Sequence, residues 1–442
     1  MVMRMSEPIL VAGAGLAGCE AAWAIAESGL PVRLLEMKPG SSTPAHHSPV
    51  FAELVCSNSL KAARPDSAAG LLKEEMRRLG SLCMEAAAVS AVPAGGALAV
   101  DRDRFSAYVT DRIRAHPLIG VEESRLDDLP SSLPAVVATG PLTAEPLASA
   151  LRELCGGALS FFDAAAPIVT AESVDMTRAF RASRYDREES GAGDYINCPL
   201  NKEEYEAFHA ALVTAETAPQ HAFDRQGRVY EGCMPIEVLA SRGLDAIRFG
   251  PMKPVGLRDP RTGHRPWAVL QLRMENADGS LLNLVGFQTN LKFGEQKRVF
   301  GMIPALHSAE FARYGVMHRN TFLDSPRLLD ADFQFRRRPG LFFAGQMTGV
   351  EGYMESAASG ILAGRNAVRF RRGQPPLLLP PDTMIGALAA HISGSPSADF
   401  QPMGANFGVL PPLDEPMRDK RKRYAALAER ALLSLERALQ GS

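Results

Sequence analysis

The sequence predicts an α/β protein in which a Rossmann-like dinucleotide-binding domain is split by an inserted α+β domain. A glycine-rich turn joins an apolar strand to an alanine-rich helix near the start of the chain. The sequence pattern differs between about residues 150 and 325, and a second buried strand with a helix rich in small residues follows. These observations predict a first domain part at 1–150, an insertion at 151–324, and a second part with a C-terminal helix at 325–442.

The N-terminal region predicts a strand, a glycine turn, a helix and a second strand. Residues 8–12 and 32–35 are apolar runs, and the stretch 19–28 between them is typical of a helix. In the G-x-G-x-x-G turn, the first glycine makes the tight bend and the second lets a pyrophosphate approach the backbone. The third lets the helix pack closely on the strand. The helix start then offers free N–H groups to phosphates.

A carboxylate at the end of the second strand completes this pattern. Glu36 follows the apolar run directly and is suited to bind ribose hydroxyls. A glycine turn that binds nothing is the alternative, but strand, helix, second strand and acid together predict a dinucleotide site. Its predicted residues are Gly13, Ala14, Gly15, Leu16, Ala17, Gly18 and Glu36.

The later elements follow from the same kinds of signal. Asn201 caps a predicted helix, with Glu204 as its reciprocal partner. The other predicted elements are a helix at Leu71–Leu82, a strand at Ala135–Ala138, a hairpin of Trp267–Glu275 and Leu281–Thr289, a buried strand at Leu341–Ala344, and a last amphipathic helix at Lys420–Leu439.

The segment 345–353 favours FAD over NAD and a glutathione-reductase-like domain. It joins a buried strand to a helix whose positive end can face a flavin ring and stabilise the charge of the reduced form. Tyr353 can stack on the ring. A loop that serves packing alone is the alternative. The predicted cofactor residues here are Gly345, Gln346, Gly352 and Tyr353.

The composition indicates a globular protein that we expect in the cytoplasm. The chain has 442 residues, of which 46% are hydrophobic and 22% charged. No apolar run reaches the ~20 residues of a membrane span, and the start has no signal-peptide pattern. The net charge of -2 confines any nucleic-acid contact to local basic patches.

Six cysteines occur without a Cys-x-x-Cys pair, so no metal site is predicted and free thiols are expected. Cys56 and Cys233 lie in turn-like contexts that suit a reactive thiol near a cleft. Burial as a small hydrophobic residue is the alternative for any cysteine. Cys19, Cys83 and Cys155 fit that alternative, and Cys198 stays open.

Ten segments carry a likeness to a known family. They are Gly13–Gly18, CSNSL (56–60), PAGGALAVDRD (93–103), ATGPLT (138–143), YINCPLNKEEYEAF (195–208), EGCMPIE (231–237), GPMKPVGL (250–257), NLVGFQTNLKFGEQKRVF (283–300), HRNTF (318–322) and GQMTGVEGYMESAASG (345–360). On these motifs the chain resembles the folate- and FAD-dependent tRNA (uracil-5-)-methyltransferases from about residue 8 to residue 370.

The resemblance implies a reaction. 5,10-Methylenetetrahydrofolate gives its methylene to the reduced flavin or directly to the uracil ring, and the carbon ends on carbon 5 of the T-loop uridine in the T arm of tRNA. NAD(P)H is the reductant and 5-methyluridine the product. Two family cysteines match Cys56 and Cys233, and both are implied in catalysis. A thiolate that adds to carbon 6 of uracil makes carbon 5 nucleophilic. We expect Cys233 in that role and Cys56 as a proton-transfer partner or second thiol near the flavin.

Substrate contacts are expected at two kinds of place. His318 and Arg319 are candidates for the folate site, since an imidazole can stack on a pterin and a guanidinium can pair with its glutamate tail; a surface pair is the alternative. Candidate tRNA contacts, each weighed against a merely solvated face, are Lys292, Lys297, Arg298 and the clusters at 336–338, 369–372 and 420–423.

Three rival functions are kept. One is the larger flavin- and folate-using enzyme of the tRNA wobble uridine, which works with a GTPase partner. The others are a small-molecule flavin oxidoreductase and a tRNA-binding chaperone with vestigial flavin. No obligate protein partner is indicated. The sequence does not specify NADH or NADPH, the order of hydride and methylene transfer, or the oligomeric state.

Overall fold

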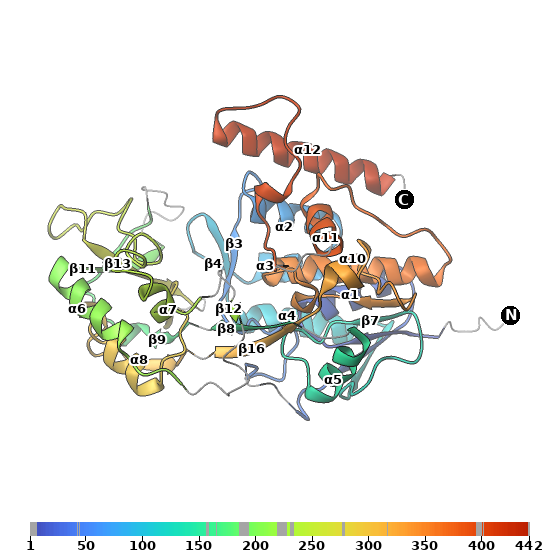
Figure 1. The fold of residues 1–442 in the computed structure, drawn as a ribbon, viewed down its shortest axis with the longest axis horizontal. Helices are drawn as coiled ribbons and strands as arrows, with labels where there is room; N and C mark the ends of the chain where they lie inside the picture. Colours follow the sequence, from blue (N-terminus) through green and yellow to red (C-terminus); the bar gives the residue numbers. More distant parts are fainter. Residues whose placement is uncertain are drawn as a thin grey trace.

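A computed structural model gives the structure of the chain. It describes residues 7–41, 43, 45–155, 159–164, 166–184, 194–218, 228–229, 234–275, 279–315, 317–394, 400 and 402–440. Two parts lie side by side, with helices α6, α7 and α8 in one and α1, α10, α11 and α12 in the other (Figure 1).

A five-stranded parallel sheet forms the centre of the larger part. Its order is β17-β7-β1-β2-β6, and each neighbouring pair is parallel. The strands are β1 (Ile9–Ala12), β2 (Val32–Glu36), β6 (Ile119–Glu123), β7 (Ala135–Val137) and β17 (Leu341–Phe343). The predicted Rossmann-like class is confirmed, and a strand from late in the chain completes a sheet begun by the first residues.

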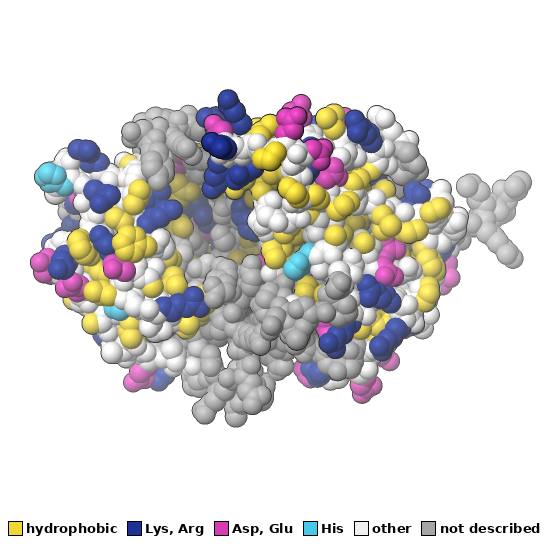
Figure 2. Space-filling view, turned by 45° about the horizontal axis from the view of Figure 1, so that its top comes forward, with side chains coloured by type: hydrophobic (Ala, Val, Ile, Leu, Met, Phe, Trp, Pro, Cys, Tyr) yellow, Lys and Arg dark blue, Asp and Glu magenta, His cyan; other side chains and the backbone are white. Residues whose placement is uncertain are grey.

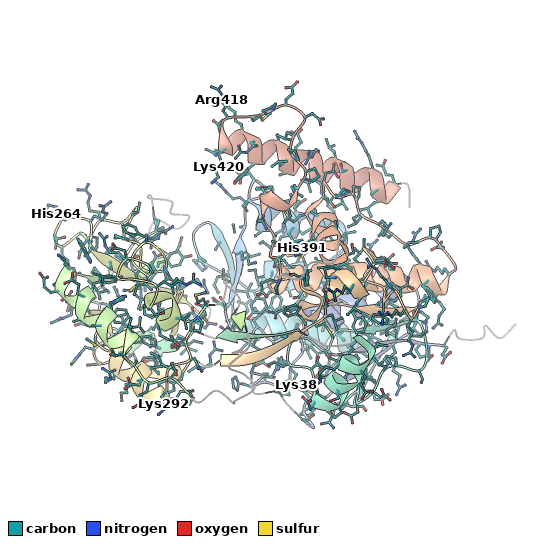
Figure 3. The ribbon with its side chains drawn as sticks, in the orientation of Figure 1. Lys38, His264, Lys292, His391, Arg418 and Lys420 are labelled. Atoms are coloured by element: carbon teal, nitrogen blue, oxygen red, sulfur yellow. The ribbon has the colours of Figure 1, made fainter. Side chains whose placement is uncertain are left out.

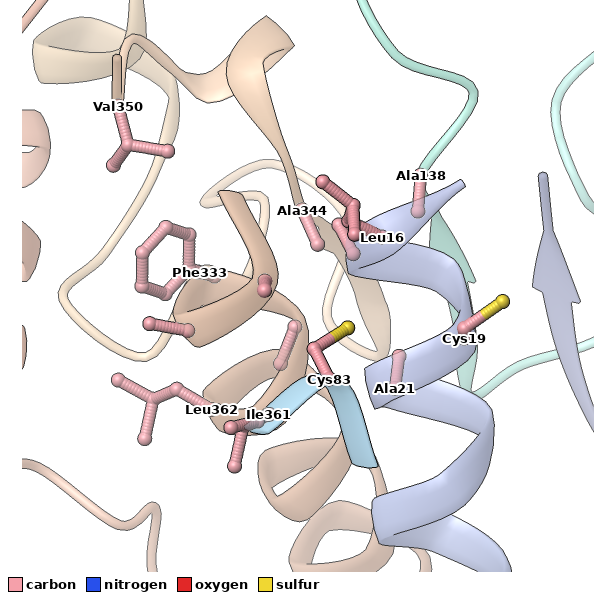
Figure 4. Close-up of a cluster of buried hydrophobic side chains, with 14 of the residues drawn as sticks. Leu16, Cys19, Ala21, Cys83, Ala138, Phe333, Ala344, Val350, Ile361 and Leu362 are labelled. Atoms are coloured by element: carbon pink, nitrogen blue, oxygen red, sulfur yellow. The ribbon is translucent and has the colours of Figure 1, made fainter. Parts of the chain in front are cut away.

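Helices make up most of the rest of the larger part, some on the sheet and others, such as α12, packed on other helices. They are α1 (Leu16–Glu27), α2 (Ala68–Arg78), α3 (Leu82–Val89), α4 (Arg102–Ala115), α5 (Glu145–Cys155), α9 (Ser325–Leu328), α10 (Tyr353–Arg371), α11 (Met384–Ser393) and α12 (Lys420–Gln440). Helix α1 packs along α10 (Figure 4). A methyl group on Gly360 would overlap the carbonyl of Ala17, so small residues set this close approach.

The predicted helix Leu71–Leu82 is wrong in its bounds, because the structure has two helices there. Helix α2 starts earlier, at Ala68, and ends at Arg78. Gly80 then takes a left-handed φ of 76°, a conformation that favours glycine. The side chain of Ser81 accepts a hydrogen bond from the N–H of Met84 and starts α3.

The smaller part is built on a six-stranded antiparallel sheet of order β10-β11-β13-β14-β9-β15. The strands are β9 (Ile168–Thr170), β10 (Phe180–Arg181), β11 (Tyr195–Leu200), β13 (Ala268–Met274), β14 (Leu281–Leu284) and β15 (Phe311–Arg313). Its helices are α6 (Lys202–Val213), α7 (Ile236–Ala240) and α8 (Phe293–Phe300). The predicted capping box is present, since Asn201 and Glu204 exchange both hydrogen bonds. Tyr205, Phe208 and Leu212 are buried in this part's own core.

Two small sheets complete the fold. One contains β3 (Ser59–Ala62), β4 (Ala91–Val92) and β5 (Ala97–Val100), and the other contains β8 (Leu159–Ala164), β12 (Arg228–Val229) and β16 (Met317–Phe322). The second lies between the two parts (Figure 1). The boundaries predicted at residues 150 and 324 stay a prediction. Among the described residues, no helix is long and apolar enough to cross a membrane.

Candidate active site

A pocket opens where the five parallel strands end. Its walls come from the residues that follow β1, β2, β6, β7 and β17, which is where ligands bind in open α/β sheets. The pocket gathers predicted cofactor residues from both ends of the chain, namely Gly13, Ala14, Gly15, Leu16, Ala17, Glu36, Gly345, Gln346 and Tyr353. Gly18 and Gly352 do not line it.

The three motif glycines differ in their surroundings. Gly13 has a φ of 95°, and a Cβ there would lie 2.5 Å from the carbonyl oxygen of Ala138. A Cβ on Gly18 would lie 1.7 Å from the carbonyl oxygen of Gly13, so this glycine sets the approach of α1 to the turn. A Cβ on Gly15 would meet nothing within 4 Å. Bare backbone at Gly15 therefore faces the pocket, which suits a close pyrophosphate.

Glu36 lines the pocket with its carboxylate already oriented by the backbone. It accepts hydrogen bonds from the N–H groups of Ala14 at 2.7 Å and Lys38 at 3.0 Å. The ammonium of Lys38 donates to the carbonyl of Ser48 at 3.2 Å and lies 3.5 Å from Glu53. A carboxylate has up to about four acceptor positions, so Glu36 keeps capacity for ribose hydroxyls.

Tyr353, the first residue of α10, joins the pocket to Cys56. Its hydroxyl accepts the N–H of Cys56 at 2.7 Å and of Ser57 at 3.1 Å, and it donates to the Cys56 Sγ at 3.0 Å. Burial raises the pKa of Tyr353, so the hydroxyl stays a proton donor at neutral pH. The ring lines the pocket, while its hydroxyl fixes a predicted catalytic thiol that lies 297 positions away in the sequence.

Arginines from two elements hold the loop around Cys56. Arg102 donates to the carbonyl of Leu54 at 2.7 Å. Arg273, on β13, donates to the Ser57 Oγ at 2.8 Å and to the Asn58 Oδ1 at 2.9 Å. Burial lowers the pKa of the Arg273 guanidinium. Cys56 is partly buried, and its loop is bonded to both parts of the molecule.

Three of the other cysteines are buried in the protein, unlike Cys56. Cys19, Cys83 and Cys198 are buried (Figure 4 shows the first two in the core), and burial raises the pKa of each thiol, to about 12 for Cys198. They fit the small hydrophobic role expected for Cys19 and Cys83. Cys233 lies outside the described residues, so the structure does not place it relative to Cys56. The side chain of Cys155, predicted to be buried, also lies outside what the structure describes.

The predicted folate residues lie on the sheet between the two parts. His318 and Arg319 belong to β16, where their Cα atoms pair with those of Asp163 and Phe162 of β8. The strand before it, β15, carries Arg313 near the Cys56 loop. His318 and Arg319 therefore lie on a strand between the six-stranded sheet and the pocket.

Some of the candidate RNA-binding side chains already bond to other groups of the protein. Arg336 and Arg338 donate to the carbonyls of Pro326 at 2.9 Å and Pro130 at 2.5 Å, and Lys292 pairs with Glu216 at 2.5 Å. In Figure 3, Lys420 lies at the end of α12 turned toward the smaller part. Figure 2 shows a hollow between the two parts, with Lys and Arg side chains on its walls and rim.

Several site residues were not predicted. The pocket is also lined by Lys38, Thr43, His46, Ser124 and Arg125. Lys38 follows Glu36 closely enough to be suspected from sequence. Arg102 lies in the PAGGALAVDRD segment, but nothing in that segment indicates its contact with the Cys56 loop. Arg273 had no recognisable local signal, since it meets the Cys56 loop only through the fold.

Comparison with known proteins gives concordant matches. A family model described as "Glucose inhibited division protein A" matches residues 8–375. The methylenetetrahydrofolate–tRNA-(uracil-5-)-methyltransferase TrmFO of Desulfitobacterium hafniense is 58% identical over 429 residues, covering 97% of each chain. That of Heliobacterium modesticaldum is 57% identical over 430 residues, again covering 97% of each.

A solved structure gives the same fold. Aquifex aeolicus GidA aligns with a TM-score of 0.68 at 15% identity, covering 100% of this chain and 76% of that one. At that identity the likeness bears on the fold alone.

Proposed function

The chain belongs to the glucose inhibited division protein A family and, within it, to the methylenetetrahydrofolate–tRNA-(uracil-5-)-methyltransferases, and from this premise we propose how its residues carry out the reaction. It is a methyltransferase that moves a one-carbon unit from methylenetetrahydrofolate to carbon 5 of a uracil in tRNA, with FAD as cofactor. The residues present fit that cofactor, since bare backbone at Gly15 and the carboxylate of Glu36 both face one pocket.

The finer parts of the reaction are proposals. The target is the T-loop uridine, and NADH or NADPH supplies the reducing equivalents. The uridine must leave its stack to reach a thiol beside the pocket. A cytoplasmic location follows from the tRNA substrate. The hollow between the two parts, with basic side chains on its walls, supports docking of a polyanion there.

One observation carries the catalytic proposal: Cys56 lies beside the cofactor pocket with its sulfur bonded to Tyr353. Bound FAD supplies the electrons that reduce the transferred carbon. Cys233 adds as a thiolate to carbon 6 of the uracil, which makes carbon 5 nucleophilic. Cys56 moves the proton that carbon 5 must lose, and Tyr353 and Arg273 hold its loop in position.

The folate is proposed to lie against β16. His318 stacks on the pterin and Arg319 pairs with an anionic group of the ligand. Their position between the six-stranded sheet and the pocket supports this assignment.

The test is transfer of label from methylenetetrahydrofolate into unmodified tRNA by the flavin-loaded enzyme. Label in 5-methyluridine of the T loop, identified by mass spectrometry, is the expected result; label at the wobble uridine would favour the rival tRNA enzyme. Cys233→Ala should lose the covalent complex with 5-fluorouridine tRNA, while Cys56→Ala should retain it but not turn over. Cys198→Ala is the control, since its thiol is buried in β11. A covalent complex with Cys233→Ala would refute the division of roles.

A further inference from the structure

Positive charge is concentrated where the last helix begins. Five of the six residues at 418–423 are Lys or Arg, and we call this segment the basic end of α12. Four of its cations are exposed, namely Arg418, Lys420, Arg421 and Lys422. None of the five cations forms an ion pair with a residue that the structure describes. The basic end is therefore a patch of uncompensated charge.

The acids near this segment do not cancel its charge. Asp419 lies within it, but its carboxylate caps the helix by accepting the N–H groups of Arg421 at 2.9 Å and Lys422 at 3.0 Å. Asp414 and Glu415 come just before, and both are exposed and form no ion pair with the described residues. Because Asp419 already serves the backbone N–H groups, it is the side chains of the basic end that are available to an anion.

This placement of charge is unfavourable for the helix itself. The start of a helix is the positive end of its dipole, where acids stabilise it and cations do not. The first four residues of α12 are all cations, and its first turn contains no acid. Lys420 and Arg423 are three positions apart, so they are neighbours on the helix and repel one another. The basic end therefore lowers the stability of free α12, and an anion bound there would relieve that repulsion.

The basic end also has no part in packing α12 onto the protein. The helix lies on α2, and its buried residues all come later, at Leu427, Ala428, Ala431 and Leu435. Ser434 donates to Asp382 at 2.6 Å, and Arg430 donates to the carbonyl of Pro412 at 2.8 Å. These contacts fix the later turns to the larger part, so the charges at the start of the helix are held in a defined place.

That place is the rim of the hollow between the two parts. Helix α12 runs along the upper edge of the larger part, and its start points toward the smaller part (Figure 1). Arg418 and Lys420 lie at this end of the helix (Figure 3), and Lys and Arg side chains gather at the rim of the hollow (Figure 2). None of the basic-end residues lines the cofactor pocket. An anion bound at the basic end is therefore not the group that reacts in the pocket.

We propose that the basic end of α12 binds backbone phosphates of the tRNA at a distance from the nucleotide that enters the cofactor pocket. This rests on the proposed function, which supplies RNA as the substrate. An RNA that lies across the hollow presents a row of phosphates, and each Lys or Arg that neutralises one releases a counterion. Contacts of this kind add affinity and orient the RNA without reading its bases. The basic end is then a hold on the substrate that is separate from the chemistry.

The experiment measures the Kd of unmodified tRNA for the flavin-loaded, full-length enzyme at salt concentrations from about 50 to about 300 mM. The main variant is Lys420→Gln/Arg421→Gln/Lys422→Gln, because glutamine keeps the length and the helix propensity of these side chains. Arg421→Gln and Arg437→Gln form a matched pair of single changes. Arg437 is an exposed arginine in the last turn of the same helix, at the end away from the hollow.

The triple variant should bind tRNA about 10- to 100-fold more weakly near 150 mM salt, and the slope of log Kd against log salt should fall by about 2–3. Arg421→Gln should lower that slope by about 1, and Arg437→Gln should leave it unchanged. The Tm of the triple variant should equal or exceed that of the wild type, since repulsion at the helix start is removed.

A triple variant with the Kd and the salt slope of the wild type would overturn the inference. So would equal weakening by Arg421→Gln and Arg437→Gln, because the effect would then follow from total charge and not from the basic end. A wild-type enzyme that binds no tRNA at any salt concentration would instead overturn the proposed function.

Discussion

The two glycines Gly15 and Gly18 allow stability to be separated from cofactor binding with one kind of substitution. In Gly18→Ala, the new methyl carbon would stand 1.7 Å from the carbonyl oxygen of Gly13. Ordinary contacts of a Cβ atom begin at 3.4 Å, so α1 must move away from the turn by roughly 1.7 Å. Overpacking in a core typically costs about 1–3 kcal/mol, and a backbone partner cannot rotate aside, so we expect about 3 kcal/mol.

Gly15→Ala is the matched variant, because a methyl group there meets nothing within 4 Å. Its φ of -73° suits any residue. We expect the free energy of unfolding of the flavin-free variant to stay within about 0.5 kcal/mol of the wild-type value. The methyl group would occupy the place where a pyrophosphate approaches, so this variant should lose bound flavin.

The assay is thermal unfolding of the flavin-free proteins together with flavin content after reconstitution. A loss of about 3 kcal/mol lowers Tm by roughly 6–12 °C for a domain of this size. Gly18→Ala should show that loss, and Gly15→Ala should keep its Tm but bind no flavin. Flavin-free Gly18→Ala with a wild-type Tm would refute the reasoning from the 1.7 Å approach.

Two further predictions concern buried polar groups. Tyr353→Phe removes the acceptor of the Cys56 and Ser57 N–H groups. The free energy of unfolding, measured in urea, should fall by about 1–3 kcal/mol, while the flavin content stays the same. An unchanged free energy of unfolding would contradict these hydrogen bonds. Burial raises the pKa of Glu75, which accepts the N–H groups of Met384 and Ile385, to about 8. The folded state therefore keeps a proton that the unfolded state releases, and the unfolding free energy should fall as pH rises from about 5 to 8. Glu75→Gln should flatten that fall, and an identical pH profile would argue against a protonated Glu75.

The sequence predicts an element or a site correctly where the pattern that encodes it is local. The glycine turn with Glu36 predicted the parallel sheet and its pocket, and Asn201 with Glu204 predicted a capping box, because each pattern spans only one or two neighbouring elements. The break at Gly80 was overlooked, although glycine followed by serine is a helix stop and start.

The contacts at the Cys56 loop could not be predicted in the same way. Tyr353 reaches Cys56 across 297 positions, and Arg273 reaches Asn58 across 215. No periodicity or spacing encodes either contact, because each depends on how elements far apart in the sequence pack together.

The late pairing of β17 with β7 bears on how the protein is made in the cell. About 200 residues separate Val137 from Leu341, and a ribosome that adds 5–20 residues per second needs roughly 10–40 s to cover them. Throughout that interval the nascent chain exposes an open edge at β7 and the face of α1 that later receives α10. Messages cut short before codon 341 should yield products that aggregate or depend on chaperones, and cofactor loading should wait until translation is nearly over.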